Sequence, residues 1–500
     1  MTKETFYITT PIYYPNDIPH LGHAYTTIAS DIIARWNKLQ GKEVFFLTGT
    51  DEHGKKIEDT AKKHKQKPKE FIDKLIPEYK KDWKTLNIEY DRFIRTTDKD
   101  HEAVVQKILQ KLQDKGDIYL GEYEGFYCIS CEAYYTEKDA PNLQCPVHEK
   151  QLEKLKEESY FFRLSKYEKF LLDHYKNNPN FILPKKRANE VINRVKEGLK
   201  DLSISRTSFD WGIPFPFDKK HVAFVWVDAL FNYYSATQEN KKLNKFWPTD
   251  LHLIGKDILW FHTVYWPALL EAVKLPLPKT VFAHGWWTVN NKKMGKSAGN
   301  AIKINDLVKI AGVDSARYFL LRETPLGDDG DFSQEMLIER HNNELANKLG
   351  NLVSRVSTLA EKYGIEKTKN TLEIEETLKQ VNEHFNNYEL HKVLEIIFHY
   401  VDKTNEYIQE KKPWEVCSPQ REAPQQGEEA RSKSESNSRK VLYELATAIK
   451  NIAILLFPFM PETAEKISKT FNFKISLDEL DKPLKESKIV KSEILFQKIQ

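Results

Sequence analysis

The sequence predicts an α/β protein with a doubly wound parallel sheet, an inserted cysteine-bearing segment and a helical C-terminal third. Three observations predict this fold class: short apolar strands alternate with helix-like stretches, a segment with glycines and three of the four cysteines interrupts the alternation, and helical periodicity dominates from about residue 340. The length of 500 residues fits about three domains, each long enough to bury its own core.

About the first seventy residues predict a βαβ unit. An apolar strand at Phe6–Ile8 is followed by a proline-rich loop, a helix-like stretch over His20–Leu39 and a second strand at Val44–Leu47. Apolar strands that alternate with helices are typical of a parallel sheet covered on both faces. Because ligands bind at the carboxyl ends of such strands, we expect the loops Thr9–Pro19 and Thr48–His53 to face a site.

Further strands are expected after the insertion, which begins near residue 116. Apolar runs return at Ala223–Val227, Leu251–Ile254 and Thr280–Ala283. Beyond them, six apolar residues share one helix face and Val441–Leu456 repeats their spacing, which predicts a helical bundle. The six are Leu345, Leu349, Leu352, Val353, Val356 and Leu359.

One segment of the predicted bundle, Ser418–Lys440, contains no aromatic residue and no aliphatic residue larger than alanine. Such a segment cannot bury enough apolar surface to offset the entropy lost on ordering it. The sequence therefore predicts a disordered loop over residues 418–440.

The composition excludes several classes of protein. The longest apolar run, Ile452–Met460, has nine residues and contains a proline, whereas a membrane-spanning helix needs about 20. The N-terminus has neither a charged leader nor a continuous apolar stretch, so no secretion signal is expected. Four cysteines exclude a disulfide scaffold and indicate a reducing cytoplasm. The net charge of +3 argues neither for nor against a nucleic-acid partner.

Two short motifs indicate phosphate chemistry. His20 and His23, in the run HLGH, lie on one face of a predicted first helical turn, where unsatisfied N–H groups favour phosphate. The run KKMGKS places Lys293, Lys296 and Ser297 in a predicted loop, where they could clamp phosphates when ATP binds. Taken singly, the first motif fits two surface histidines equally well, and the second fits a solvated charged loop.

The clustered cysteines predict a metal site. Two pairs with knuckle spacing occur in the insertion, and they supply four N/S ligands: Cys128, Cys131, Cys145 and His148. Four protein ligands close a tetrahedron around zinc, so the predicted Zn²⁺ is structural. Unrelated reduced thiols are the alternative, and Cys417 is interpreted as an incidental thiol.

The motifs together resemble the class I aminoacyl-tRNA synthetases, whose HIGH and KMSKS motifs correspond to HLGH and KMGKS. The runs PIYYPNDIPHLGHAY, FFLTGTDEHG, VWVDAL, HLIGKDILWFH, LGNLVSR and EKKPWE resemble, in this order, the methionyl-tRNA synthetase family. One departure is Gly295, which replaces a serine of KMSKS, removes a hydroxyl and adds backbone freedom. The resemblance implies a Rossmann-like (HUP) catalytic domain with a zinc-knuckle insertion, followed by an all-α anticodon-binding bundle.

The resemblance also implies a reaction: ATP-dependent activation of L-methionine to methionyl-adenylate, then transfer to the 3′ end of tRNA(Met), for initiation and elongation of protein synthesis. It implies Mg²⁺ with ATP, one structural zinc, a CAU anticodon as the RNA target and a monomer in the cytoplasm. The monomer is expected because the sequence stops at Gln500 without an appended tRNA-binding module.

Site residues follow from the same resemblance. His20, His23, Lys293 and Lys296 are implied as catalytic residues, and with Gly22 and Ser297 they bind ATP. Methionine is implied to contact Ile12, Tyr14, Asp51, Trp226, Tyr233, Phe261 and His262, and the anticodon to contact Asn351, Arg355 and Trp414. Asp51 could instead be a helix N-cap, and each aromatic could be a core residue. Without the resemblance, Trp414 fits a packing residue and Arg355 a solvated one.

The expected domains are residues 1–115 and 221–290 for the two halves of the catalytic domain and 116–220 for the connective insertion. Residues 291–345 would form the KMSKS-loop and stem-contact region, and 346–500 the anticodon-binding domain.

A valine, leucine or isoleucine enzyme would need a larger insertion for editing, and a cysteinyl enzyme an open zinc position. An adenylyltransferase would not need the bundle, and a zinc-knuckle RNA-binding protein would not need HLGH and KMGKS.

Overall fold

A computed structural model describes residues 3–128, 133–135, 140–146, 150–290, 292–293, 302–416, 428–480, 482–484 and 489–500. The chain divides into two compact units. The first comprises Met1–Ser30, Lys42–Lys84 and Ile88–His284, and the second comprises Asp31–Gly41, Thr85–Asn87 and Gly285–Gln500.

The first unit is built on a six-stranded sheet in the order β3-β2-β1-β11-β12-β7. Every neighbouring pair is parallel, so the doubly wound parallel sheet predicted from the sequence is confirmed. The strands are β1 (Thr5–Thr9), β2 (Glu43–Thr50), β3 (Arg92–Arg95), β7 (Ile182–Leu183), β11 (Leu251–Gly255) and β12 (Thr280–His284).

Helices connect these strands because parallel neighbours need a crossover between them. Tyr7, Leu47 and Val281 of three different strands are buried in one core cluster with residues of the helices. The helices are α1 (Leu21–Leu39), α2 (Lys55–Lys63), α3 (Pro68–Thr85), α4 (Lys99–Asp114), α5 (Glu168–Asn177), α6 (Lys185–Lys196), α7 (Val225–Leu230), α8 (Asn232–Ser235) and α9 (Trp266–Ala272). A π-helical turn, η5 (Phe261–Tyr265), precedes α9.

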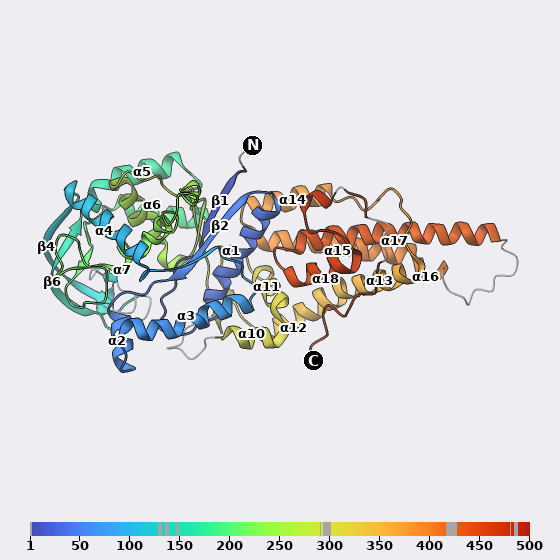
Figure 1. Cartoon of the computed structure of the whole chain (residues 1–500), viewed down its shortest axis with the longest axis horizontal. Coiled ribbons are helices and arrows are strands. Elements are labelled where there is room, and N and C mark those ends of the chain that lie inside the picture. Colours follow the sequence, from blue (N-terminus) through green and yellow to red (C-terminus); the bar gives the residue numbers. More distant parts are fainter. Residues whose placement is uncertain are drawn as a thin grey trace. The chain divides into compact units, whose positions relative to one another are not determined.

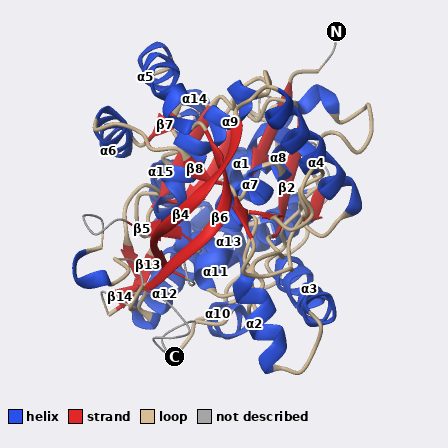
Figure 2. Cartoon of the chain, turned by 90° about the vertical axis from the view of Figure 1, so that its left-hand side faces the viewer, coloured by secondary structure: helices blue, strands red, loops and turns tan. Residues whose placement is uncertain are grey.

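The insertion forms a separate antiparallel sheet in the order β5-β4-β6-β8, in which β4 and β6 are the long strands (Figure 2). Its strands are β4 (Ile118–Cys128), β5 (Ala133–Tyr135), β6 (Glu153–Phe162) and β8 (Leu202–Ser203), and β9 (Ser205–Arg206) pairs with β10 (Val222–Ala223). Cys128 and Cys145 are buried in one small cluster with Ala140 and Leu152. The other two predicted ligands, Cys131 and His148, lie outside the described residues.

The second unit carries the helical bundle that the sequence predicts. Leu345, Leu349, Leu352, Val353 and Val356, on the predicted apolar face, are buried. The helices are α10 (Ile304–Ala311), α11 (Val313–Arg322), α12 (Gln334–Arg340), the π-helical η7 (His341–Gly350), α13 (Asn351–Tyr363), α14 (Glu375–Asn386), α15 (Leu390–Lys411), α16 (Pro413–Val416), α17 (Glu428–Leu456) and α18 (Pro461–Phe471). A small sheet, in the order β14-β13-β15, joins β14 (Lys292–Lys293), β13 (Trp287–Val289) and β15 (Gly330–Asp331).

The prediction of a disordered loop over residues 418–440 is wrong for 428–440, which form the N-terminal part of α17 (Figure 1). These residues extend a helix whose later turns are buried, and adding turns to an existing helix avoids the cost of nucleation. Glu366 also anchors them, since its carboxylate accepts a hydrogen bond from Ser436 Oγ (2.9 Å) and pairs with Arg439 (3.4 Å). Residues 417–427, with Cys417, lie outside the described part of the chain.

Two negative findings apply to the part of the chain that the structure describes. None of their helices combines the length and the apolar character that crossing a membrane requires. They also contain no group of three or more His, Cys, Asp or Glu side chains arranged to hold a metal ion.

Candidate active site

The two histidines of HLGH meet at the start of α1. Their rings stack with centroids 4.0 Å apart, and the His20 backbone N–H donates to Nδ1 of His23 (3.2 Å). The Gly22 N–H donates to Nδ1 of His20 (3.1 Å), and a Cβ on Gly22 would lie 3.0 Å from the His20 ring. Glycine at this position therefore gives the ring room beside the backbone. Both rings lie where a helix N-terminus attracts anions.

Tyr13 contacts the histidine pair, although the sequence did not predict it as a site residue. Its ring meets the His23 ring edge-on at 4.9 Å, and its hydroxyl lies 2.7 Å from Thr27 Oγ1. Its backbone joins two strand ends, because the Tyr13 N–H donates to the Gly49 carbonyl and the Asp51 N–H donates to the Tyr13 carbonyl, each at 2.9 Å. The proline-rich loop indicated this region, but no pattern distinguished Tyr13 from Tyr14 beside it.

Two residues of the predicted methionine site meet where α7 approaches η5, the turn after β11. Trp226 and Phe261 stack face to face, with centroids 3.7 Å apart and planes 3° from parallel. Phe261 and His262 begin the π-helical turn η5, and such single turns occur often at functional sites because the wider turn changes where side chains project. The structure thus brings these three predicted methionine contacts together.

The buried side chains beside this stack, Tyr233 and His262, are polar but uncharged. Burial lowers the pKa of His262 to about 4, so its imidazole is neutral at pH 7. Nδ1 lies 3.0 Å from the Ile258 carbonyl oxygen, which accepts a hydrogen bond only if Nδ1 carries the proton. Nε2 is then the acceptor for the Tyr233 hydroxyl at 2.7 Å. Tyr233 and His262 therefore form one oriented pair.

Ile12 and Tyr14 pack against the core cluster that contains Tyr233. The Tyr14 hydroxyl donates to the His53 carbonyl oxygen (2.8 Å), which connects the loop after β1 to the turn after β2. Tyr14 thus reaches the turn that carries Asp51.

The turn Asp51–Gly54 follows β2 directly. Asp51 is 8% exposed, and α2 has its N-cap at Gly54, so the alternative in which Asp51 caps this helix is wrong. Gly54 has a φ of 106°, which favours glycine, and its N–H donates to the Trp211 carbonyl (2.9 Å). The Asp51 carboxylate therefore does not cap α2, and its partners lie elsewhere.

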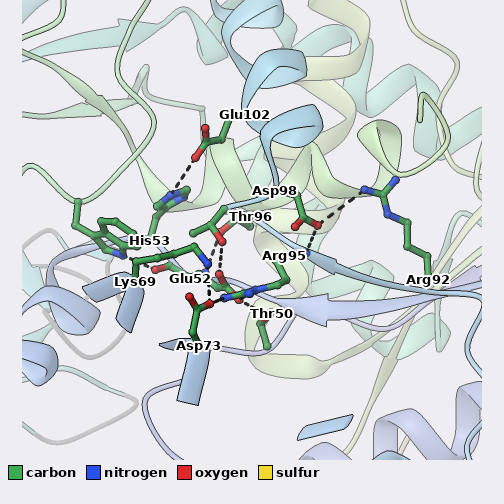
Figure 3. Close-up of polar contacts among 12 residues, drawn as sticks. Thr50, Glu52, His53, Lys69, Asp73, Arg92, Arg95, Thr96, Asp98 and Glu102 are labelled. Carbon is green, nitrogen blue, oxygen red and sulfur yellow. Dashed lines mark hydrogen bonds and ion pairs between the residues drawn. The ribbon is translucent and has the colours of Figure 1, made fainter. Parts of the chain in front are cut away.

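Glu52 is fully buried in this turn and holds it to the next strand. Its carboxylate accepts hydrogen bonds from Arg95 Nε (2.6 Å) and Thr97 Oγ1 (2.5 Å). Arg95 also pairs with Asp73 (2.6 Å), so the guanidinium lies between two carboxylates (Figure 3). A buried carboxylate is stabilised only when such donors surround it.

His53 pairs with Asp228 of α7, and both are buried. Nδ1 of His53 lies 2.6 Å from Asp228 Oδ2, and Nε2 lies 4.0 Å from the Glu102 carboxylate. Burial alone would lower the pKa of His53, but the charges of Asp228, Glu102 and Glu52 outweigh it and raise that pKa. Burial would likewise raise the pKa of Asp228, but His53 and His101 lower it. Sequence reasoning missed this pair, although a charged residue inside VWVDAL was a signal.

The remaining predicted residues fall in the second unit. Lys293 lies in β14, paired with Thr288 of β13, while Lys296 and Ser297 lie outside the described residues. The Arg355 guanidinium lies 4.8 Å from the centroid of the Trp414 ring, so two predicted anticodon contacts meet. Asn351 is exposed at the start of α13, one helical turn before Arg355.

A cavity of about 900 Å³ lies elsewhere in the first unit, along β2, β3 and the start of α4. None of the predicted site residues lines it. Arg92, which does line it, is held by Asp100 (2.7 Å) and Glu239 (2.9 Å). The chemistry predicted from the sequence therefore does not belong to this cavity.

Comparisons with known proteins agree with this geometry. The family described as "tRNA synthetases class I (M)" matches residues 6–154 and 139–357, and "Anticodon-binding domain of tRNA ligase" matches residues 371–500. The chain is 46% identical to a methionine–tRNA ligase of Caldanaerobacter subterraneus subsp. tengcongensis, over 99% of this chain and 79% of that relative. It is 43% identical to the methionine–tRNA ligase of Bacillus subtilis (strain 168), over 100% and 78% of the two chains.

A solved structure is also similar: Mycobacterium tuberculosis methionyl-tRNA synthetase in complex with methionyl-adenylate. It is 37% identical, covers 99% of each chain and has a TM-score of 0.93. The parallel sheet, the histidine pair at the start of α1 and the helical second unit define a class I aminoacyl-tRNA synthetase. Within that class, the chain belongs to the methionyl-tRNA synthetase family.

The His53–Asp228 pair predicts a pH-dependent stability. Because the pKa of His53 is raised in the folded protein, its contribution is complete below its ordinary pKa of about 6.5 and is lost as pH rises through the raised value. His53→Asn keeps an N–H donor but cannot take the charge. We expect it to lower the free energy of unfolding by about 1.5–3 kcal/mol at mildly acidic pH and by less at alkaline pH.

Urea unfolding of both proteins across this pH range measures the difference. His174→Asn is the matched control, since burial lowers the pKa of His174 and the wild-type residue must therefore destabilise the fold as pH falls. The same pH dependence in both variants would contradict the assignment of a charged His53.

Proposed function

We propose that this chain activates L-methionine with ATP and transfers it to the 3′ end of tRNA(Met), for both initiation and elongation of protein synthesis. The observation that carries the proposal is the stack of Trp226 and Phe261 beside the neutral Tyr233–His262 pair, at the sheet edge where the histidines of HLGH begin α1. We propose that the methionine side chain binds against this stack, in a site called the slot below. The similar structure bound to methionyl-adenylate supports the first half-reaction.

The slot suits methionine chemically. A thioether sulfur is polarizable and gains roughly 0.3–1.5 kcal/mol against an aromatic ring. A branched aliphatic side chain would lack that sulfur, and it would leave the polar pair of Tyr233 and His262 facing a hydrocarbon. In this proposal Ile12, Tyr14, Trp226, Tyr233, Phe261 and His262 enclose the side chain. Asp51 receives the α-ammonium group.

The ATP half of the site is proposed to comprise His20, Gly22, His23, Lys293, Lys296 and Ser297. The methionine carboxylate attacks the α-phosphate in line, the bond to the β-phosphate breaks, and pyrophosphate leaves with its Mg²⁺. A ribose hydroxyl at the tRNA 3′ end then attacks the carbonyl carbon of methionyl-adenylate, the methionyl ester forms, and AMP leaves. The histidines and lysines are proposed to stabilise charge on the phosphates. Because the methionine carboxylate is itself the nucleophile, this step needs no covalent bond to the enzyme.

The domain division is part of the proposal. Residues 1–115 and 221–290 carry the chemistry, 116–220 are the connective insertion, 291–345 hold the KMSKS-type loop, and 346–500 bind the anticodon. The contact between Arg355 and Trp414 supports the last assignment, because RNA loops are read by stacking on aromatic rings and by Arg or Asn side chains. Asn351 completes the proposed set for CAU.

One structural zinc is proposed in the insertion, held by Cys128, Cys131, Cys145 and His148. Cys128 and Cys145 lie buried in one cluster, which brings together one ligand from each knuckle. When bound, the metal would cross-link the two knuckles of a small domain that has little core of its own. A monomer in the cytoplasm remains the prediction from sequence, and sedimentation of the purified protein tests the monomer.

The function is tested by ATP–pyrophosphate exchange with each amino acid in turn. We expect exchange with methionine alone, and we expect Lys296→Ala to lower its rate by about tenfold or more, which corresponds to about 1.4 kcal/mol of transition-state stabilisation. Affinity for methionine should change little, because Lys296 is proposed to contact phosphate. Exchange driven by another amino acid would contradict the proposal, and an unchanged rate in Lys296→Ala would contradict the role of that lysine.

Anticodon reading is tested by Trp414→Ala. We expect aminoacylation of tRNA(Met) to fall by about tenfold or more, since base stacking on an aromatic contributes roughly 1–3 kcal/mol. Methionine-dependent exchange should stay near the wild-type rate, because activation does not need tRNA. Trp414→Phe is the matched control, since it keeps a ring beside Arg355. Equal losses in both assays would point to misfolding.

The zinc is tested by Cys145→Ala, with Cys417→Ala as the control that keeps all four proposed ligands. Elemental analysis of the purified wild type should give about one zinc per chain, the stoichiometry that four protein ligands imply. We expect Cys145→Ala to lose that zinc and to become sensitive to proteolysis within the insertion. Unaltered zinc content and activity in Cys145→Ala would overturn the assignment.

A further inference from the structure

The turn Asp51–Gly54 contains a buried charge that the proposed reaction does not use. Asp51 is the proposed receptor for the ammonium group, but His53, two residues later, is 3% exposed and points to Asp228. Its backbone carbonyl accepts the Tyr14 hydroxyl at 2.8 Å. His53 therefore connects the turn both to α7 and to the loop after β1.

Asp228 uses both of its carboxylate oxygens. Oδ2 lies 2.6 Å from Nδ1 of His53, and Oδ1 lies 2.7 Å from Nε2 of His101 on α4. Nδ1 of His101 lies 2.8 Å from the Ser235 hydroxyl of α8. The fully buried carboxylate of Asp228, which belongs to α7, thus contacts both the turn after β2 and helix α4.

The position of Asp228 in α7 links the two ends of the proposed methionine site. Trp226, one of the two stacked rings of the proposed slot, lies two residues before Asp228 in the same six-residue helix. Asp51 lies two residues before His53. The contact between Asp228 and His53 therefore links the helix that carries Trp226 to the turn that carries Asp51.

A buried ion pair is a costly way to fill a core. Replacing such a pair with apolar residues of similar size is often neutral or stabilising, so stability alone gives little reason for a charge at position 228. The pair does fix geometry, because a carboxylate between two imidazoles restricts all three side chains at once. Apolar packing would not restrict the rotation and spacing of these groups in the same way.

We infer that Asp228 is a positioning residue for methionine binding: by holding His53 and His101, it sets the distance between the Asp51 carboxylate and the Trp226 slot. The inference rests on the proposed role of Asp51. Asp228 itself does not touch substrate, so its loss must weaken only ligands that engage both the slot and Asp51.

The test measures ATP–pyrophosphate exchange by Asp228→Asn. We expect KM for methionine to rise by about tenfold or more, while KM for ATP stays within about twofold, since a lost positioning contact removes binding of one substrate only. The matched control is Asp117→Asn, which removes another fully buried carboxylate, paired with Lys166 (2.6 Å) and hydrogen-bonded to Tyr167, at the start of β4. It should lower thermal stability without changing KM for methionine.

A second measurement uses the deaminated analogue of methionine, in which hydrogen replaces the α-ammonium group. We expect Asp228→Asn to bind this analogue as the wild type does, because the analogue uses the slot but not Asp51. His53→Ala should weaken methionine as Asp228→Asn does, and His53→Asn should restore much of the loss, since it keeps an N–H donor toward Asp228. These His53 variants keep the test available if Asp228→Asn does not fold.

The two hypotheses fail in different ways. If wild-type protein binds methionine and the deaminated analogue equally well, then Asp51 does not receive the ammonium group and the inference falls with it. Suppose instead that the wild type prefers methionine to the deaminated analogue and that Asp51→Asn abolishes this preference. If Asp228→Asn and His53→Ala then keep the wild-type KM for methionine, the role of Asp51 stands and the inference alone is overturned. Equal weakening of methionine and analogue by Asp228→Asn would also overturn it.

Discussion

The parallel pairing of β1 with β2 is the constraint on which the candidate site depends. The strands pair from Thr5 with Glu43 to Thr9 with Leu47, so they end side by side at one edge of the sheet. Beyond the strands, the Tyr13 and Asp51 backbones continue the contact with two further hydrogen bonds. The loops that carry Tyr14 and Asp51 therefore cannot shift independently. A slip of one residue in this register would also turn every strand side chain to the opposite face.

Two buried histidines show how neighbours, and not burial alone, set the charge of this site. His262 faces a tyrosine hydroxyl and a backbone carbonyl, so burial prevails and its pKa falls to about 4. His53 is equally enclosed, but Asp228 and Glu102 face it and raise its pKa. The slot proposed for the methionine thioether is consequently uncharged, whereas charge is concentrated beside the turn that carries Asp51. An amphiphilic amino acid fits a site divided in this way.

What the sequence could predict depended on how local each pattern was. The strands of the parallel sheet and the bundle face follow from spacings of two to four residues, and the structure confirms them. The strand predicted at Ala223–Val227 is wrong, because only Ala223 belongs to a strand and Val225–Val227 begin helix α7; an apolar run of this length does not distinguish a buried strand from a buried helix. The His53–Asp228 contact joins residues 175 positions apart, so no local spacing indicates it. The prediction of disorder over 428–440 failed for a different reason. Composition treats a segment as isolated, whereas this segment continues a helix whose later turns are buried. The contact between Arg355 and Trp414 could not be predicted from the motifs alone, because it also depends on the fold.

In the second unit, too, a buried charge is held by matched partners, and one of them lies on helix α1. It begins with the histidine pair, but from Asp31 onward it belongs to the second unit. There the Asp31 carboxylate binds Arg35 (2.8 Å) and the fully buried Arg317 (2.6 Å), and Arg317 donates to the carbonyls of Pro458 and Phe459 (both 2.9 Å). A guanidinium can be buried only where such acceptors match its fixed fork of donors. Because these acceptors come from α1 and from the turn between α17 and α18, the charge of Arg317 ties the far end of α1 to the helical bundle.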